Sequence, residues 1–356
     1  MGLSLLLGGL GALLARSLHL PGGAVIGAIV LTAVGNLVGI SLEEPPSWLR
    51  AAARIVLGLT IGATVTPDTV AAIGRAQLPI LGMIFCMLGL GMLIAWAIHR
   101  LTHMPLSTAL CGSSPGGLTT LVVMSTDLGG QASLVASMHM VRLVSVTLFT
   151  PAFVEAVFPN GGSIPPSVVA ADGSAPVALW QLLVLLALGL LAGLAARGLK
   201  IPGGDMIVGL LVAAIANITW LHLPDLPGSW KLFAQWVIGA GVGATVTRQA
   251  LRDFKPYALA GSLMTTLLIL AGLLSGWLLA RLTALDLLTA IMGSSPGGAD
   301  TMMILAGELG ADARLVTAMH VSRLIVITLF TPLAIRVLGG RRREKTSVGL
   351  AEVSSK

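Results

Sequence analysis

Charged side chains are scarce in this 356-residue chain: Asp, Glu, Lys and Arg make up 10% of it, against 55% hydrophobic residues. Soluble domains carry about a quarter charged residues, which cover the surface that faces water. The mean hydropathy of +0.94 agrees with this shortage. The composition therefore argues against a soluble enzyme or a nucleic-acid-binding protein and predicts an integral membrane protein that contacts the lipid bilayer.

Potential metal ligands are also few. The two cysteines, Cys86 and Cys111, lie in apolar runs without metal-ligand spacing, which excludes a disulfide scaffold. Among the six histidines only His99 and His103 have i,i+4 spacing, and they lie beside Arg100 with no carboxylate nearby. No haem, flavin or iron–sulfur signature is present. We therefore expect no metal, no cofactor and no enzyme activity.

Internal repetition is what the chain has in abundance. Residues 111–151 and 292–332 align without a gap at an offset of 181 (292 − 111 = 181), and 21 of the 41 aligned positions are identical. Self-similarity of this kind marks a duplicated structural unit. The chain divides into two membrane repeats, at residues 1–158 and 179–338. An extracytoplasmic linker at 159–178 joins the repeats, and a basic tail follows at 339–356.

The loop charges predict how the repeats cross the membrane. The linker has no Lys or Arg while the tail is basic, so the positive-inside rule places the linker outside and the C-terminus in the cytoplasm. The linker and the tail follow equivalent ends of the two repeats, so their location on opposite sides of the membrane requires inverted repeats. Each repeat must then cross the membrane an odd number of times. We predict an all-α polytopic membrane protein with about 10 transmembrane helices and two broken segments. The six apolar elements of the first repeat are 3–18, 24–41, 53–73, 78–98, 106–126 and 131–157.

The fifth element of each repeat contains the sequence GSSPGG, which interrupts a helix. Irregular backbone at membrane depth survives only where it lines a cavity walled by protein. A helix that restarts there would point free N–H groups at an anion. The element is either a re-entrant hairpin or two crossing half-helices. The candidate substrate-binding residues are Ser113, Ser114, Pro115, Gly116 and Gly117, with Ser294, Ser295, Pro296, Gly297 and Gly298.

The sixth element places His139 and Arg142 on one helix face, and His320 and Arg323 repeat the pattern. Ionisable groups within a membrane span are costly and usually mark a pathway. Arginine suits a substrate carboxylate, and histidine would couple transport to protons. Alternatively, each His–Arg face satisfies the carbonyl groups of the broken segment in its own repeat.

Asp300 breaks the symmetry of the repeats, because Thr119 occupies the matched position. Its carboxylate would carry a proton or a sodium ion, or serve only as the partner of Arg323. We count Asp300 with the two histidines as a coupling residue.

The doubled GSSPGG unit, the M-H-x-x-R helix and the LFTP ending resemble the AbrB family of bacterial inner-membrane proteins, over residues 1–338. Members of that family often carry the label of an ammonia monooxygenase, which the scattered histidines do not support. The resemblance implies a multi-pass protein of the inner membrane that acts as a transporter, and it implies no particular substrate.

We interpret the chain as a secondary transporter of a small organic anion or zwitterion, which binds between the two broken segments. The alternatives are a channel-like facilitator for a small neutral or ammonium-like solute, and a membrane regulatory protein without transport. Coupling to protons or sodium ions and assembly into a homodimer stay open.

Overall fold

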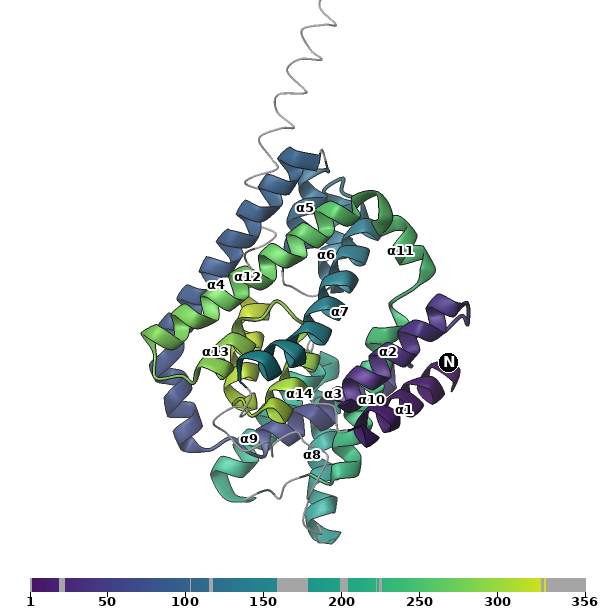
Figure 1. The fold of residues 1–356 in the computed structure, drawn as a ribbon. Helices are drawn as coiled ribbons and strands as arrows, with labels where there is room; N and C mark the ends of the chain where they lie inside the picture. The colour runs from purple at the N-terminus through teal and green to yellow at the C-terminus, as the bar shows by residue number, and fades with distance from the viewer. Residues whose placement is uncertain are drawn as a thin grey trace, which may run out of the picture.

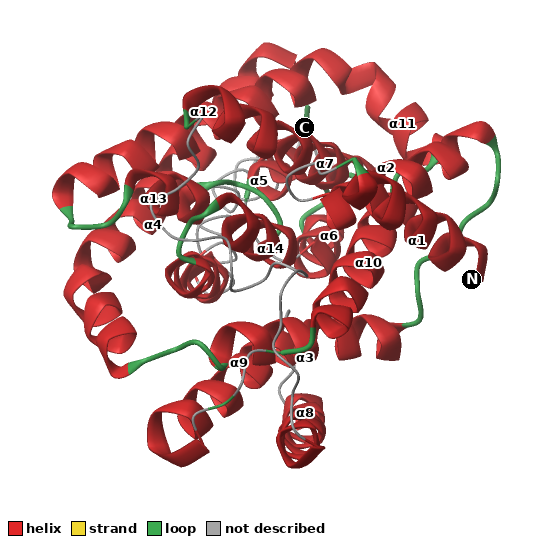
Figure 2. Ribbon diagram, turned by 60° about the horizontal axis from the view of Figure 1, so that its bottom comes forward, coloured by secondary structure: helices red, strands yellow, loops and turns green. Residues whose placement is uncertain are grey.

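The computed structural model describes residues 2–18, 23–102, 104–114, 118–158, 179–198, 204–221, 223, 226–327 and 330. Within these residues the chain forms helices and no strand (Figures 1 and 2), as the all-α prediction requires. The first half contains α1 (Gly2–Ser17), α2 (Gly23–Val38), α3 (Ser47–Gly62), α4 (Pro67–Thr102), α5 (Leu106–Ser113), α6 (Leu118–Asp127) and α7 (Ala132–Val157). The second half contains α8 (Leu179–Gly198), α9 (Gly204–Ala216), η1 (Asn217–Leu221), α10 (Gly228–Ala244), α11 (Arg248–Phe254), η2 (Lys255–Tyr257), α12 (Ala258–Leu282), α13 (Leu287–Ser294) and α14 (Ala299–Leu309), followed by a helix over 313–327.

Several of these helices have the length and hydropathy that a bilayer demands. Three described helices are long and apolar enough to cross a membrane, at Ile73–Thr102, Ala132–Val157 and Arg248–Leu282. Shorter apolar helices lie at Gly2–Ser17, Gly23–Val38, Leu183–Ala195 and Gly204–Thr219. The architecture therefore fits a protein that spans a membrane. The predicted linker 159–178 and tail 339–356 lie outside the described residues.

The helices form two groups, which Figure 1 shows side by side. In the first bundle, α1, α2, α3, α8, α9 and α10 pack on one another. In the second bundle, the long helices α4 and α12 pack together and enclose the broken segments and α7. Fewer contacts join the bundles, mainly where α7 and α14 meet α10. One cluster of buried apolar residues nevertheless joins the bundles, from Leu57 in α3 and Ile238 in α10 to Met302 and Leu305 in α14.

Glycines allow the helices of the first bundle to approach closely. A Cβ added to Gly58 of α3 would overlap the carbonyl of Met206 in α9, and one added to Gly239 of α10 would overlap that of Val25 in α2. Small residues permit this spacing in membrane helices. Both residues of one contact lie 181 positions from their counterparts in the other, and each contact joins the first half of the chain to the second.

Two asparagines repeat the same crosswise pairing. The amide of Asn36 in α2 donates to the carbonyl oxygen of Ala244 at 2.9 Å, and Asn217 donates to that of Val65 at 3.0 Å. Each amide oxygen accepts the backbone N–H six residues further along the chain, at 2.8 Å in both cases. The polar group of each asparagine is therefore satisfied at a helix end that would otherwise expose free carbonyls.

The predicted division between the elements 53–73 and 78–98 is wrong. The third helix ends at Gly62, and α4 begins at Pro67 and continues through the predicted break. Thr66 caps this helix start, because its hydroxyl oxygen accepts a backbone N–H three residues on at 3.3 Å. Proline in the first turn fits this start as well. Apolar periodicity alone does not reveal so short a break.

Each broken segment folds back on itself. The N–H of Gln131, just past α6, donates to the hydroxyl of Thr108 in α5 at 2.9 Å, and the N–H of Asp312 donates to that of Thr289 in α13 at 2.9 Å. The beginning and the end of each segment therefore lie together. Each segment thus returns close to the point at which it begins.

The glycine contacts generate a stability prediction. Gly239→Leu forces a side chain against the backbone of α2 and should lower the free energy of unfolding by about 1–3 kcal/mol. Gly82→Leu is the matched control, because a Cβ at this position of α4 meets nothing within 4 Å. Thermal unfolding of the detergent-purified variants measures the difference. Equal melting temperatures for the two variants would contradict the close approach.

Candidate functional site

A cavity of about 870 Å³ lies between the two bundles. Its walls come from α3, α7, α10 and α11, from the start of α14, and from the helix over 313–327. Exposed residues such as Ser133 and Gln249 line one end, while the buried side chains of His320 and Arg323 line its depth. The cavity therefore reaches from one surface of the protein into its interior.

Eight of the residues singled out in the sequence line this cavity, and they come from both halves of the chain: His139, Arg142, Pro296, Gly297, Gly298, Asp300, His320 and Arg323. The start of α14 also faces the cavity, through Ala299 and Thr301. Pro115, Gly116 and Gly117 lie outside the described residues.

The serines of the GSSPGG motifs are placed differently. The hydroxyls of Ser113 and Ser114 donate to the carbonyl of Leu110, at 3.1 and 2.8 Å. The hydroxyl of Ser294 donates to the carbonyl of Gly272 in α12 at 2.8 Å. These serines, and Ser295 with them, are absent from the lining of the cavity. The hydroxyls of Ser113 and Ser114 thus bond within their own helix, and that of Ser294 joins the second hairpin to α12.

Arg142 and His139 hold the first hairpin from α7. The end of α5 leaves carbonyl groups without helical partners. Nη1 of Arg142 donates to three of them, and Nε2 of His139 lies 2.9 Å from a fourth; these belong to Gly112 (3.2 Å), Ser113 (3.2 Å), Ser114 (3.3 Å) and Cys111. The structural role that the sequence left open is thus present in the first half.

Arg323 holds the second hairpin in the same way. Its Nη1 donates to the carbonyl of Ser295 at 2.6 Å and its Nη2 to that of Gly297 at 3.3 Å. His320, one turn earlier, has its Nδ1 3.0 Å from the carbonyl of Val316 in its own helix. The arginine therefore binds hairpin carbonyls in both halves. The histidine differs, because His139 bonds the hairpin whereas His320 bonds its own helix.

The two arginines bring positive charge to the cavity without a matching acid. Both side chains are buried, with 5% of Arg142 and 3% of Arg323 exposed, and no carboxylate of the described residues forms an ion pair with either. Nε of Arg142 is also without a partner in the described part of the chain. The acids that line the cavity have other partners: Glu44 pairs with Arg50, Asp300 with Arg54, and Asp253 with the amide of Gln249. Carbonyl oxygens offset part of the charge of a buried guanidinium, and an anion would offset the rest.

Asp300 does not pair with Arg323, and this part of the sequence interpretation is wrong. Its carboxylate accepts from Nε of Arg54 at 2.9 Å, so the ion pair joins α14 to α3 of the opposite bundle. Position 235, matched to Arg54, is a glutamine. The sequence does indicate a special role for Arg54, because it is an ionisable residue in the middle of an apolar helix.

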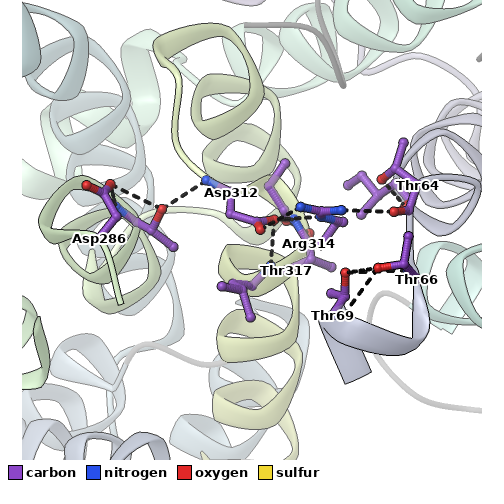
Figure 3. A network of polar contacts seen from close by, with 11 residues as sticks. Thr64, Thr66, Thr69, Asp286, Asp312, Arg314 and Thr317 are labelled. Carbon is purple, nitrogen blue, oxygen red and sulfur yellow. Dashed lines mark hydrogen bonds and ion pairs between the residues drawn. The ribbon is translucent and has the colours of Figure 1, made fainter. Parts of the chain in front are cut away.

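A polar network outside the lining of the cavity holds the break between α3 and α4 (Figure 3). Nη1 of Arg314 donates to the carbonyl of Thr64 at 3.0 Å, and so joins the start of the helix over 313–327 to the break between α3 and α4. The two carboxylate oxygens of Asp312 hold this guanidinium at 2.9 and 2.8 Å. Thr289 receives the N–H of Asp312 and in turn donates to Asp286, which caps α13. Arg314 is thus held by the carboxylate of Asp312 on one side and by the carbonyl of Thr64 on the other.

The matched positions of the first half keep the bond to Thr108 but lack the arginine and the carboxylate that holds it. Ser133 occupies the place of Arg314 at an offset of 181, and Thr245 occupies the place of Thr64. Both residues line the open end of the cavity. The cavity thus reaches Ser133 and Thr245 but not Arg314 or Thr64, and we call the Arg314 end the closed end.

Comparison with known proteins identifies the relatives of this chain. It matches the family described as "Transition state regulatory protein AbrB" over residues 1–63 and 44–339. The chain belongs to the AbrB family. It is 30% identical over 328 residues to the "Putative regulator AbrB" of Escherichia coli (strain K12), which covers 90% of this chain and 91% of that protein. It is 24% identical over 318 residues to "Uncharacterized protein YhjN" of Bacillus subtilis (strain 168), covering 85% and 82%. The family predicted from the sequence is confirmed.

The described residues of this AbrB-family chain include no group of three His, Cys, Asp or Glu side chains that could hold a metal ion. The polar residues of the cavity instead include arginines, histidines, hydroxyl side chains and two ion pairs, Glu44–Arg50 and Asp300–Arg54. Such a set can bind an anion and position it by hydrogen bonds.

The Arg54–Asp300 pair can be tested by a double-mutant cycle. The two side chains are 32% and 23% exposed, so solvent screens their attraction, and we expect a coupling energy on the order of 1 kcal/mol between Arg54→Gln and Asp300→Asn. Unfolding of the purified single and double variants measures it. Arg54→Gln combined with Asp253→Asn is the control, because Asp253 lines the same cavity but bonds Gln249. Additive effects in both cycles would contradict the ion pair.

Proposed function

We propose that this AbrB-family protein is a secondary transporter, which moves a small organic anion or zwitterion across the inner membrane. Its substrate site is the cavity between the bundles. The observation that supports this is the pair of buried arginines, Arg142 and Arg323, which line the cavity without an acidic partner among the described residues. An anion in the cavity would lower the cost of burying these two charges.

The inverted-repeat topology is part of this proposal. Because each broken segment is a hairpin, five crossing elements remain in the first repeat: α1, α2, α3, α4 and α7. An odd number of crossings turns the second repeat upside down relative to the first. The crosswise glycine and asparagine contacts support a two-fold relation between the repeats, and the basic tail supports a cytoplasmic C-terminus.

The two ends of the fold suggest alternating access. In transporters with inverted repeats, an exchange of conformation between the repeats moves the opening from one side of the membrane to the other. In this protein, such an exchange would break the Arg314–Thr64 contact. The matched residues Ser133 and Thr245 would approach each other at the same time. The closed end favours a transporter over the channel-like facilitator, which needs a path open at both ends. Asp300 and Arg54 are positioned to couple the exchange to a proton or sodium ion.

A regulatory membrane protein is the second candidate, because the name of the Escherichia coli relative describes a regulator. In that case the same cavity would bind a ligand that controls a partner, and nothing would cross the membrane. Ligand binding without uptake separates this function from transport.

Uptake of radiolabelled organic acids into proteoliposomes tests the transport proposal. We expect uptake that a pH or sodium gradient drives, and Arg323→Gln should reduce it by at least about tenfold because the cavity loses half of its unpaired charge. Arg281→Gln is the matched control. This variant makes the same change in the same repeat, on an exposed side chain that stacks on Trp277 away from the cavity.

The folded fraction of each variant is measured alongside, because Arg323 also ties the second hairpin. Normal uptake by folded Arg323→Gln protein would contradict the anion site. Binding of an acid to the wild type with no uptake under any gradient would favour the regulatory function.

The closed end generates a separate prediction. Arg314→Ser places in the second half the residue that the first half has at the mouth, and it should shift the protein toward a state open at the other end. We expect thiol labelling of Thr69→Cys, at the closed end, to rise about tenfold, since several hydrogen bonds of the network are lost. Labelling of Ala250→Cys, its counterpart at the cavity mouth, should fall.

Both reporter cysteines are placed in a background with Cys86 and Cys111 changed to Ala. Reagents that do not cross the membrane, added from each side, also determine which end faces the cytoplasm. Unchanged labelling at both positions would show that the Arg314 network does not control access.

A further inference from the structure

The two histidines of the cavity occupy matched positions and nevertheless differ in their hydrogen bonding. Both ring nitrogens of His139 have partners: Nε2 lies 2.9 Å from the carbonyl of Cys111, and Nδ1 lies 3.0 Å from Nη2 of Arg142. A carbonyl only accepts and a guanidinium only donates, so Nε2 carries the hydrogen and Nδ1 the lone pair. The ring of His139 is neutral, and its bonding capacity is used up.

The ring of His320 has one nitrogen left over. Its Nδ1 lies 3.0 Å from the carbonyl of Val316, so this nitrogen carries the hydrogen. Its Nε2 is buried and has no partner in the described part of the chain, while the residue is 1% exposed and lines the cavity. A second hydrogen on the ring would add a positive charge beside Arg142 and Arg323. The ring therefore presents a lone pair at Nε2.

A buried acceptor without a donor is costly, and native proteins rarely leave one unpaired. A ligand in the cavity that brings a hydrogen-bond donor to Nε2 of His320 would remove this cost. The neighbouring guanidinium groups decide which donor suits this place. An ammonium group would be repelled by the two arginines, whereas a hydroxyl donates without bringing positive charge.

We propose that the substrate is a hydroxylated carboxylate anion, whose hydroxyl donates to Nε2 of His320 while its carboxylate offsets the charge of Arg142 and Arg323. This inference rests on the proposed transport function and narrows its substrate class. The hydroxyl and the carboxylate belong on adjacent or nearby carbons, because His320 and Arg323 lie one helical turn apart on the same helix. A site built around a hydroxyl rejects an analogue that lacks it, since the acceptor is then left unpaired.

Matched pairs of acids test this class with the purified full-length protein. Binding of glycolate and acetate, of L-lactate and propionate, and of L-malate and succinate is measured by calorimetry and by shifts in melting temperature. We expect the hydroxylated member of at least one pair to bind at least about tenfold more tightly than its partner.

Three variants connect this preference to one nitrogen. His320→Leu removes the acceptor and should abolish the preference, while His320→Gln keeps an acceptor and should retain it. His139→Leu removes a ring whose two bonds are structural, so it should lower the melting temperature and leave the preference intact. The two histidine positions thereby separate recognition of the hydroxyl from stability of the hairpin.

Each outcome decides between the proposals. Equal binding within every pair would overturn the hydroxyl inference and leave the anion site standing. A preference that persists in His320→Leu would overturn it as well, because the hydroxyl would then be recognised elsewhere. Absence of binding by all six acids, in protein that melts cooperatively, would overturn both the hydroxylated class and the organic-anion site.

Discussion

Backbone groups that interrupt a helix inside a membrane protein must find partners within the protein, and the rest of this structure depends on how that need is met. The two GSSPGG hairpins end short helices in the interior, where lipid offers no hydrogen bonds. Arg142 and Arg323 supply donors to the freed carbonyls. A neutral donor could do the same, but a guanidinium also brings charge. The groups that satisfy the freed carbonyls thus also place two cations at the cavity, and the proposed anion site rests on them.

The sequence predicted the elements of this fold whose signals are repeated. The offset of 181 residues located both hairpins and both His–Arg faces without any coordinates. It did not reveal the break before Pro67, because apolar residues continue on both sides of it. Nor did it reveal that Arg54 pairs with Asp300, since the two residues lie 246 positions apart and neither is repeated. Contacts that exist in only one half leave no pattern that alignment of the halves can detect.

Those unrepeated contacts are where the two halves differ in structure. Ser133 and Arg314 occupy equivalent places, yet one lines the mouth and the other lies at the closed end. His139 and His320 are identical residues, yet only one retains a free acceptor. The shared residues build the scaffold, and the residues that differ give the cavity a direction and an asymmetric interior. A symmetric pair of repeats would bind two equivalent ligands or one symmetric ligand.

The crosswise glycine contacts also constrain the order of assembly during synthesis. Gly58 in α3 packs against Met206 in α9, so its partner leaves the ribosome 148 residues later (206 − 58). At about 5–20 residues per second, the small-residue face of α3 waits on the order of ten seconds for its partner. Ribosome pausing within that interval would prolong the exposure of α2 and α3 together. The first half of this protein thus enters the membrane as an unfinished surface, and the insertion machinery or the surrounding lipid must shield it until the second half arrives.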